Sequence, residues 1–305
     1  FDPFPRLGPS PPRGPHRPAM GRPTRAEPVR RARSVPLLAA VVAAVALVHY
    51  GFCRGRPDAG VTADAVEQPL MPVSFLDSSS RRVVKKVLDV FPGAMKGSAV
   101  MSRLMRAVKP YGLKRHNTVY GQSLCSDEIN SDPGHISTLL SRHYGRAFTL
   151  GGIGGAPYSG KTGFMAFSHH VPDSGHVLVV FGPHIGFSPD GEPGKFSRIG
   201  QEALSTSCGA VVAAYNQINS GENMPADPKD MEQSWLRLKL KQAAPEVAQS
   251  SKRPMVDLVM KAYKAIEAEV LDIVNTDFGP GHLVLLGGIQ INMPYPLPGY
   301  FMPLH

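Results

Sequence analysis

Hydrophobic residues recur every three or four positions in several segments of the chain, which places them on one face of an α-helix. The longest such stripe runs from Met255 to Val274. The same spacing predicts further helices over about 80–110, with a break at Pro92-Gly93, and over 135–144, 199–218 and 229–243. Each of these helices has an apolar face that must pack against another element.

Other segments have the continuous or alternating apolar runs typical of β-strands. HVLVVFG (176–182) and HLVLLGGIQIN (282–292) are apolar almost throughout, which indicates strands covered on both faces. Shorter runs predict strands over 117–124, 147–152 and 164–171, and the residues after Asn292 predict an irregular tail. Strands interleaved with helices predict an α/β fold with a mixed, largely parallel sheet covered by helices.

The first 70 residues differ in composition from the remainder and form a predicted leader. An Arg-rich stretch precedes an apolar run of fourteen residues at 35–48, which is the layout of a signal peptide. If the segment 35–52 stays uncleaved, it could anchor the chain in a membrane. A second Arg-bearing stretch follows Phe52, which suits delivery through the secretory route to an algal plastid. Residues 71–305 then form the folded domain.

The positive charge of the chain belongs mainly to this leader. The whole sequence has a net charge of +9, and residues 1–58 contribute +7 of it, which leaves about +2 for the folded part. The folded part therefore lacks the basic field of a nucleic-acid-binding protein, and we expect no nucleic-acid partner.

The segment Gly155–Thr162 matches the phosphate-loop pattern G-x-x-x-x-G-K-[ST]. That motif binds a nucleotide only where a strand enters the loop and a helix leaves it. The residues after Thr162 alternate between two faces and predict a strand, and neither later buried strand ends in an aspartate for magnesium. We therefore expect no nucleotide, although a phosphate-loop NTPase is kept as an alternative.

Three cysteines, Cys53, Cys125 and Cys208, are too few for a disulfide scaffold. Cys125 follows the predicted strand 117–124, and His184 follows the strand 176–182, so both belong to the strand ends where α/β sheets bind ligands. Two thiolates and an imidazole would leave a tetrahedral zinc ion with an open fourth position, as in catalytic sites.

Other interpretations of these residues remain open. Either cysteine can be a small buried hydrophobe, and Cys125 with Cys208 can form a disulfide in an oxidising compartment. His184 can cap a turn, and Asp127 with Glu128 can be a solvated turn. The gaps of 59 and 24 residues that separate Cys125, His184 and Cys208 match no local metal signature.

Several motifs in one order resemble the LCIB family of algal limiting-CO2-inducible proteins, from about Val83 to His305. They are GQSLCSDEIN, LGGIGGAPYSGKTGF, HHVPDSG, FGPHIG, RIGQ, SCGA and LLGGIQIN. The family includes theta-type carbonic anhydrases that are related in fold and site to the β class. The resemblance implies a β-carbonic-anhydrase-like fold, a zinc cofactor, a homodimer and a Gly-rich loop that binds no nucleotide.

The resemblance also implies roles for single residues. Cys125, His184 and Cys208 match the zinc ligands, and Asp127 matches the aspartate beside the metal. The pattern C-x-D-x-R of mainstream β-carbonic anhydrases has Ile129 here in place of its arginine, so Asp127 needs another cation. We expect Arg198 of RIGQ to pair with it.

The implied function is the reversible hydration of CO2 to bicarbonate by a zinc-bound hydroxide, in an algal carbon-concentrating pathway. The enzyme would be a lyase, a carbonate dehydratase. His170 or His169 is a candidate proton shuttle, because histidine side chains ordinarily titrate near neutral pH. Gln122, Leu124 and Val171 are candidates for the substrate pocket. The alternative is a non-catalytic, zinc-bearing scaffold protein of a carbon-concentrating complex.

Overall fold

A computed structural model of the chain describes residues 77–221, 224–241, 245, 247, 252–274 and 278–305. The predicted leader at 1–70, its apolar runs at 35–48 and 35–52, and Cys53 lie outside these residues. Among the described residues, no helix combines the length and the apolar character needed to cross a membrane.

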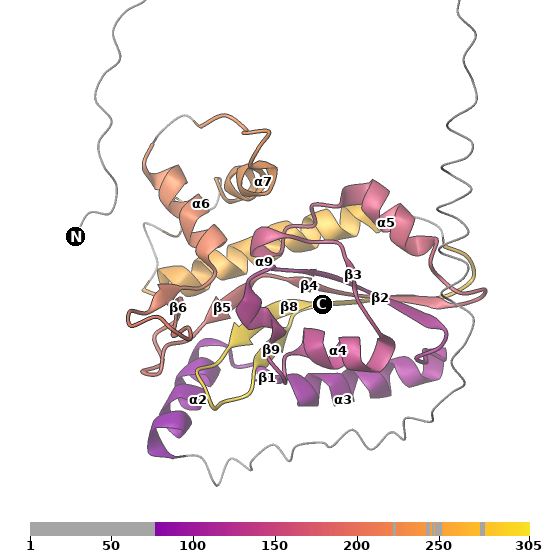
Figure 1. The fold of residues 1–305 in the computed structure, drawn as a ribbon, viewed down its shortest axis with the longest axis horizontal. Coiled ribbons are helices and arrows are strands. Elements are labelled where there is room, and N and C mark those ends of the chain that lie inside the picture. Colours follow the sequence, from indigo (N-terminus) through magenta and orange to yellow (C-terminus); the bar gives the residue numbers. More distant parts are fainter. Residues whose placement is uncertain (1–76, 222–223, 242–244, 246, 248–251, 275–277) are drawn as a thin grey trace, which may run out of the picture. The chain divides into compact units, whose positions relative to one another are not determined.

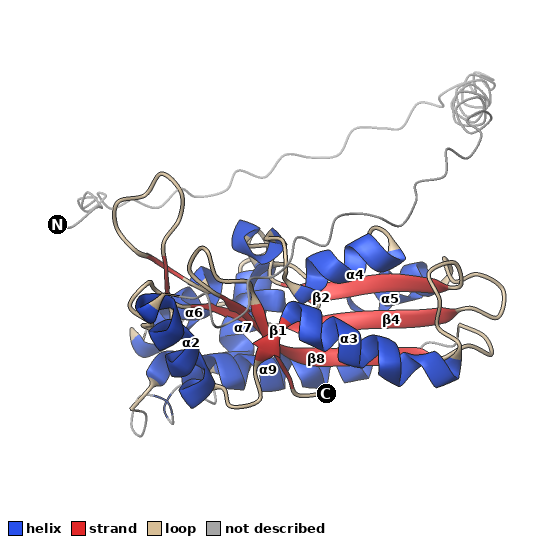
Figure 2. Cartoon of the chain, turned by 90° about the horizontal axis from the view of Figure 1, so that it is seen from below, coloured by secondary structure: helices blue, strands red, loops and turns tan. Residues whose placement is uncertain are grey.

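The central strand β4 (His176–Gly182) is buried at every position, as its continuous apolar sequence predicts. It pairs in parallel with β2 (Thr118–Leu124) on one side and with β8 (Leu283–Asn292) on the other. Figures 1 and 2 show these strands side by side. The order of the sheet is β1 (Met95–Lys96), β9 (Tyr300–Pro303), β8, β4, β2 and β3 (Phe148–Thr149), and β5 (His184–Gly186) pairs with β8. In this sheet only the two pairings of β9, with β1 and with β8, are antiparallel, so the prediction of a mixed, largely parallel sheet is confirmed.

Helices cover both faces of this sheet, because alternate side chains of β4 point to opposite sides. On one face, Val177, Val179 and Phe181 pack with α2 (Ser78–Val90), α5 (Gly160–Ser168) and α9 (Pro254–Ile273). Leu178 and Val180 pack with α3 (Gly97–Val108) and α4 (Ile136–Tyr144) on the other face. Figure 1 shows α5 and α9 above the sheet and α3 and α4 below it. The predicted helices at 80–110, 135–144 and 254–274 are therefore confirmed.

A third cluster of buried side chains lies where α6 (Gly209–Asn219) and α7 (Met231–Leu240) pack on each other and on α9. Its members include Cys125, Cys208 and Leu236. Both cysteines therefore lie in the small core that joins α6 and α7 to the sheet. Short 3-10 turns complete the fold at Lys109–Tyr111, Glu128–Ser131 and Ile153–Gly155.

The prediction of a strand over 164–171 is wrong, because helix α5 occupies Gly160–Ser168. Its buried residues are Phe164, Phe167 and Ser168, which are three and four positions apart and form one helical face. The alternation of apolar and polar letters in this short segment fits both periods. The helix is the conformation that buries both Phe164 and Phe167 on the same side, against the sheet.

The prediction of a helix over 199–218 is correct only in its second half. Residues before Cys208 form an antiparallel hairpin of β6 (Lys195–Phe196) and β7 (Ser205–Thr206), and Cys208 is the N-cap residue of α6. Gly200, with a φ of 81°, lies in the turn of this hairpin, where a helix could not continue. The residues after Asn292 are also not wholly irregular, because Tyr300–Pro303 form β9 along β8.

Candidate metal centre

Cys125, His184 and Cys208 converge on one point although they are far apart in the sequence. Cys125 directly follows β2, His184 opens β5 two residues after β4 ends, and Cys208 precedes α6. Because β2 and β4 are parallel neighbours, their carboxyl ends lie at the same edge of the sheet. The three ligand atoms lie within 4.8 Å of one another, and all three residues are buried.

The distance between the two sulfur atoms fits a shared metal ion. Sγ of Cys125 and Sγ of Cys208 lie 3.7 Å apart, and neither cysteine is in a disulfide. A disulfide would place the sulfurs about 2 Å apart. Two sulfurs that bind one tetrahedral zinc ion at about 2.3 Å are about 3.8 Å apart. The geometry therefore favours a metal ligand pair over the disulfide that the sequence left open.

His184 presents one ring nitrogen to the two sulfurs. Its Nδ1 donates a hydrogen bond to Oδ1 of Asn292, at 2.8 Å, whereas its Nε2 is buried and has no hydrogen-bond partner among the described residues. A buried nitrogen of this kind normally has a partner. A metal ion bound by Cys125 and Cys208 would supply one, so the donor set fits a Cys2His metal site.

Backbone amides stabilise negative charge on both sulfurs. The N–H of Gly154 donates to Sγ of Cys125 at 3.1 Å. The hydrogen bond from Cys125, followed by the amides of Val211 and Ala210 at the start of α6, lowers the pKa of Cys208 below its usual range, although burial opposes the shift. Hydrogen bonding to Cys208, together with burial, raises the pKa of Cys125. Cys208 is therefore the first of the two to become a thiolate.

Asp127 lies beside these ligands and is held by Arg198. Nη2 of Arg198 donates to both carboxylate oxygens of Asp127, at 2.9 and 2.7 Å, which is the pairing predicted from the sequence. The side chains of Asp127 and Arg198 are only 12% and 16% exposed. Arg198 also binds Glu128 and the hydroxyl of Ser205. Oδ2 of Asp127 is 3.6 Å from Nε2 of His184, so the carboxylate borders the candidate metal position.

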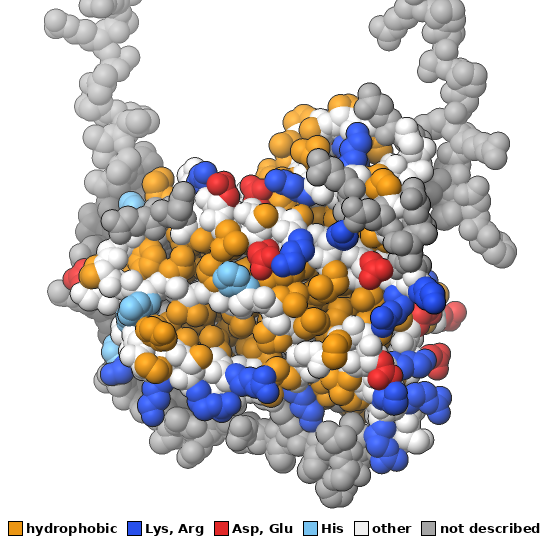
Figure 3. Space-filling view, turned by 180° about the vertical axis from the view of Figure 1, so that it is seen from behind, with side chains coloured by type: hydrophobic (Ala, Val, Ile, Leu, Met, Phe, Trp, Pro, Cys, Tyr) orange, Lys and Arg blue, Asp and Glu red, His pale blue; other side chains and the backbone are white. Residues whose placement is uncertain are grey.

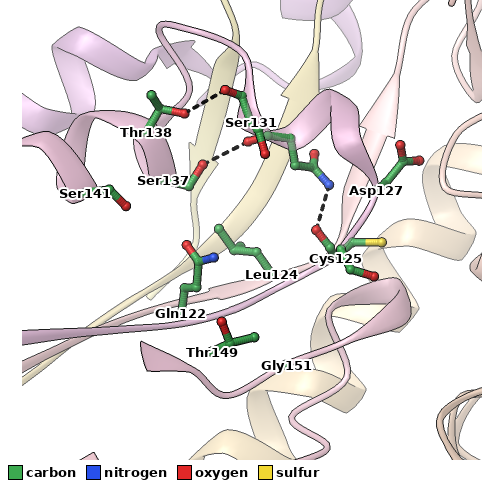
Figure 4. Close-up of a pocket in the computed structure, with 12 residues that line it drawn as sticks. Gln122, Leu124, Cys125, Asp127, Ser131, Ser137, Thr138, Ser141, Thr149 and Gly151 are labelled. Atoms are coloured by element: carbon green, nitrogen blue, oxygen red, sulfur yellow. Dashed lines mark hydrogen bonds between the residues drawn. The ribbon is translucent and has the colours of Figure 1, made fainter. Parts of the chain in front are cut away.

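A cavity of about 490 Å³ opens onto Cys125 and Asp127. Figure 4 shows the side chains that surround it. Gln122 and Leu124 line it, as predicted, whereas Val171 does not, because it lies in the turn after α5 and packs against the main core. The remaining lining residues are mostly small and polar: Ser126, Asn130, Ser131, Ser137, Thr138, Ser141, Thr149 and Gly151.

His169 and His170, the candidate proton shuttles, are not brought to this site. Both are exposed and directly follow the end of α5. The chain then enters β4 at His176, which pairs with Thr118 at the start of β2, whereas the metal ligands follow the ends of these strands. The ring of His170 instead lies 5.7 Å from that of Phe148.

Buried amide side chains behind the ligands were not predicted. Asn130, Gln290 and Asn292 form a hydrogen-bonded network that reaches His184 and the carbonyl oxygen of Cys125. The sequence does contain a signal for it. Two amide residues alternate with isoleucines in the last buried strand, IQIN, where an unsatisfied polar side chain would be costly.

Several backbone amides of the phosphate-loop-like segment are engaged within the loop itself. A helix does follow the loop, so the first of the two reasons given from the sequence against a nucleotide is wrong, whereas the absence of an aspartate after the later strands still holds. However, the amides of residues 155, 156, 158, 159 and 160 donate to carbonyl oxygens within residues 150–157. Lys161 forms an ion pair with Asp272 at 3.0 Å. These contacts provide a different reason for the expectation of no nucleotide, which stays a prediction.

Solved structures with this fold include that of PtLCIB4, described as a homolog of the limiting CO2-inducible protein LCIB. It is 31% identical, with a TM-score of 0.67 over 72% of this chain and 92% of that one. A histidine-to-alanine mutant of PtLCIB4 is 30% identical, with a TM-score of 0.68 over 73% of this chain and 92% of that one. LCIB itself, at 21% identity and a TM-score of 0.56 over 72% of this chain and 91% of that one, shares the fold. No curated protein matches the chain.

The family comparison agrees with this structural likeness. The model of the limiting CO2-inducible proteins B/C, described as beta carbonic anhydrases, matches residues 94–305. This range contains the whole sheet, the three candidate ligands and the pair of Asp127 with Arg198. Because the match covers more than two thirds of the sequence, the chain belongs to the family of limiting CO2-inducible proteins B/C.

Proposed function

We propose that the protein is a zinc-dependent carbonic anhydrase that converts CO2 to bicarbonate reversibly. The observation that carries the proposal is the convergence of two sulfurs and a buried, unpartnered imidazole nitrogen beside a carboxylate held by arginine. A family described as beta carbonic anhydrases and a similar structure at 31% identity support it.

Cys125, Cys208 and His184 would hold the zinc ion and leave one position open toward the cavity. When bound, zinc lowers the pKa of a coordinated water molecule and so supplies hydroxide near neutral pH. Two thiolate ligands donate more charge than two imidazoles would, so we expect activity to rise with pH across the neutral range. Amide donation from Gly154 to the sulfur of Cys125 reduces that charge donation.

Asp127 would accept a hydrogen bond from the attacking oxygen and aim its lone pair at the carbon of CO2. Arg198 keeps the carboxylate in place through two hydrogen bonds. It also keeps Asp127 away from the open ligand position, which the carboxylate could otherwise occupy. Arg198 therefore acts as a positioning residue for Asp127.

The cavity would admit CO2 and release bicarbonate. Leu124 offers an apolar surface beside Cys125, and Gln122 an amide, of which Oε1 already accepts a hydrogen bond from the hydroxyl of Tyr120. No histidine is among the residues that line the cavity. We therefore propose that the proton leaves through water to buffer rather than through His170.

Zinc analysis combined with stopped-flow CO2 hydration on the full chain tests the proposal. We expect about one zinc ion per chain, as a single Cys2His site requires. Hydration should fall to the buffer rate after chelation and return when zinc is added. A zinc-loaded protein whose rate equals that of buffer would instead support a non-catalytic scaffold.

The homodimer and the plastid address stay predictions. Figure 3 shows hydrophobic side chains gathered over the middle of the face opposite to the view of Figure 1, with lysine and arginine side chains around its lower rim. Extended apolar areas of this kind are common at protein interfaces, which supports a homodimer. Sedimentation of the purified chain would measure its oligomeric state.

A further inference from the structure

The imidazole of His184 can bind a metal through Nε2 only if its other nitrogen carries the proton. Nδ1 lies 2.8 Å from Oδ1 of Asn292, and the two side chains are 1% and 0% exposed. The imidazole and the amide therefore contact each other directly. Which atom of the Asn292 amide faces the ring therefore decides which nitrogen is protonated.

The surroundings of Asn292 settle the orientation of its amide. Its Nδ2 lies 3.1 Å from the carbonyl oxygen of Ile129 and 3.0 Å from Oδ1 of Asn130. A backbone carbonyl can only accept a hydrogen bond, so the nitrogen end of the amide must point toward it. The oxygen end then faces His184, and Nδ1 must be the donor.

Asn130 is oriented by the same reasoning. Its Nδ2 donates to the carbonyl oxygen of Cys125 at 3.1 Å, and its Oδ1 accepts from Asn292 and from Nε2 of Gln290, the latter at 2.8 Å. The carbonyl of Cys125 accepts only, so Asn130 cannot turn over without losing both ends of its bonding. One directional chain of amides thus joins the backbone of Cys125 to the ring of His184.

We propose that Asn292 is the positioning residue that prepares His184 as a metal ligand, by holding the ring as the Nδ1–H tautomer with the Nε2 lone pair toward Cys125 and Cys208. This inference rests on the proposed metal site and adds to it the residue that sets the ligand's protonation and direction. Groups that hold the second nitrogen of a histidine ligand typically raise metal affinity 10–100-fold.

Gln290 offers a matched control for Asn292. It lies two residues earlier on β8, is 1% exposed and belongs to the same network through Asn130 and Ser137, but its hydrogen bonds do not reach His184. Asn292→Leu and Gln290→Met are of similar size to the original residues, and each removes one buried amide. Only the first removes the nearer acceptor of the imidazole N–H; the hydroxyl of Ser207, 3.4 Å from Nδ1, is present in both variants.

The test measures zinc affinity by competition with a chromophoric chelator on the full chain. We expect Asn292→Leu to weaken zinc binding about 10–100-fold. Gln290→Met should change it less than about threefold, on the same reasoning. Asn292→Asp keeps an oxygen acceptor for Nδ1 but loses the donor to the carbonyl of Ile129 and to Asn130, so it should recover part of the affinity lost in Asn292→Leu. Equal losses in Asn292→Leu and Gln290→Met would reduce Asn292 to a structural role and overturn the inference.

A second measurement does not depend on whether the variants fold. Nitrogen-15 NMR of the histidine rings in the zinc-free, unsubstituted protein reports which nitrogen of His184 carries the proton. A protonated Nδ1 supports the inference, and a protonated Nε2 overturns it. Neither result depends on turnover, so a protein that shows the expected tautomer and affinities but no CO2 hydration would lose only the proposed enzymatic function.

Discussion

The two ends of the parallel sheet both contain histidines, yet in the described structure only one end forms a candidate metal centre. At the amino end, the rings of His176 and His282 stack 5.3 Å apart, and Nδ1 of His176 accepts from the backbone N–H of His282. The ring of Tyr111 packs against His282. These aromatic groups contact one another, and no group at that end of the described structure could hold a metal ion with three ligands.

At the carboxyl end the same residue type has a different environment. His184 has one nitrogen engaged by Asn292 and the other turned, without a hydrogen-bond partner, toward two sulfurs. The difference shows that residue type alone does not make a site. A site needs ligand atoms whose lone pairs are left free and face a common point.

The largest test of this difference removes a sulfur. Cys208→Ser replaces a thiolate with a hydroxyl, which is a poor zinc ligand, so we expect both zinc and CO2 hydration to fall to background. Metal analysis and stopped-flow assay measure the two effects. Cys53→Ser, the same change in the leader, is the control and should leave both unchanged. Full zinc content in Cys208→Ser would remove the basis of the candidate site.

A smaller loss of CO2 hydration is expected when the metal ligands are kept and Asp127 loses its hydrogen bonds to Arg198. Arg198→Leu should retain zinc but lower hydration about 100-fold, because the oriented hydrogen bond from Asp127 is lost. Glu128→Gln removes only the exposed charge that also pairs with Arg198, and it serves as the control. A rate in Arg198→Leu equal to that of the unsubstituted protein would show that Asp127 needs no arginine.

The pH dependence of stability offers a further test at the carboxyl end. His135, buried at the start of α4, has its pKa lowered to about 4, first by burial and second by the charge of His184. Because this lowered pKa favours neutral His135 in the folded state, its contribution is present above pH 6.5 and is lost as pH falls toward 4. The loss is about 3 kcal/mol.

Urea unfolding of zinc-free protein at pH 7 and pH 4 checks this expectation. His135→Asn stays uncharged in acid and should flatten the dependence, since asparagine also suits an N-cap position. His170→Gln, at the exposed end of α5, should leave the dependence as it is. If the free energy of unfolding fell equally between pH 7 and pH 4 in the unsubstituted protein and both variants, His135 would not be the source of the pH dependence.

The smallest effect is expected at the other end of the sheet. His170→Ala should change the rate of CO2 hydration by less than about twofold, because this exposed side chain lies toward the ends of the strands opposite to the metal ligands. Stopped-flow assay at low buffer concentration is the sensitive condition. A large loss that added imidazole restores would identify His170 as the proton shuttle after all.

Much of this arrangement could be predicted from local patterns in the sequence. The continuous apolar run at 176–182 indicated a strand buried on both faces. The positions of Cys125 and His184 just after predicted strands indicated that both lie at the carboxyl edge of the sheet. The segment at 164–171 was misassigned because eight residues fit two periods equally well. The hairpin that carries Arg198 was missed because its strands are only two residues long.

Convergence in space could not be obtained from spacing alone. Nothing in gaps of 59 and 24 residues indicates that three side chains meet; the parallel pairing of β2 with β4 and of β5 with β8 brings them together. Asn292 was missed for the same reason, since its contact with His184 depends on the register that pairs it with Gly186. The resemblance to a known family, and not the letters alone, supplied the ligand set.

The hairpin of β6 and β7 carries the partner of Asp127 and leads to one of the candidate metal ligands. Its turn carries Arg198, and its second strand leads directly to Cys208. Ser205 binds the guanidinium of Arg198 and the backbone of Phe196, so hydrogen bonds hold the hairpin together. Arg198 in turn binds the hairpin to Asp127. Displacing the hairpin would withdraw a sulfur and release the carboxylate in a single movement. Cys208 as a metal ligand and Arg198 as the partner of Asp127 therefore both depend on this hairpin, although Arg198 itself binds no metal.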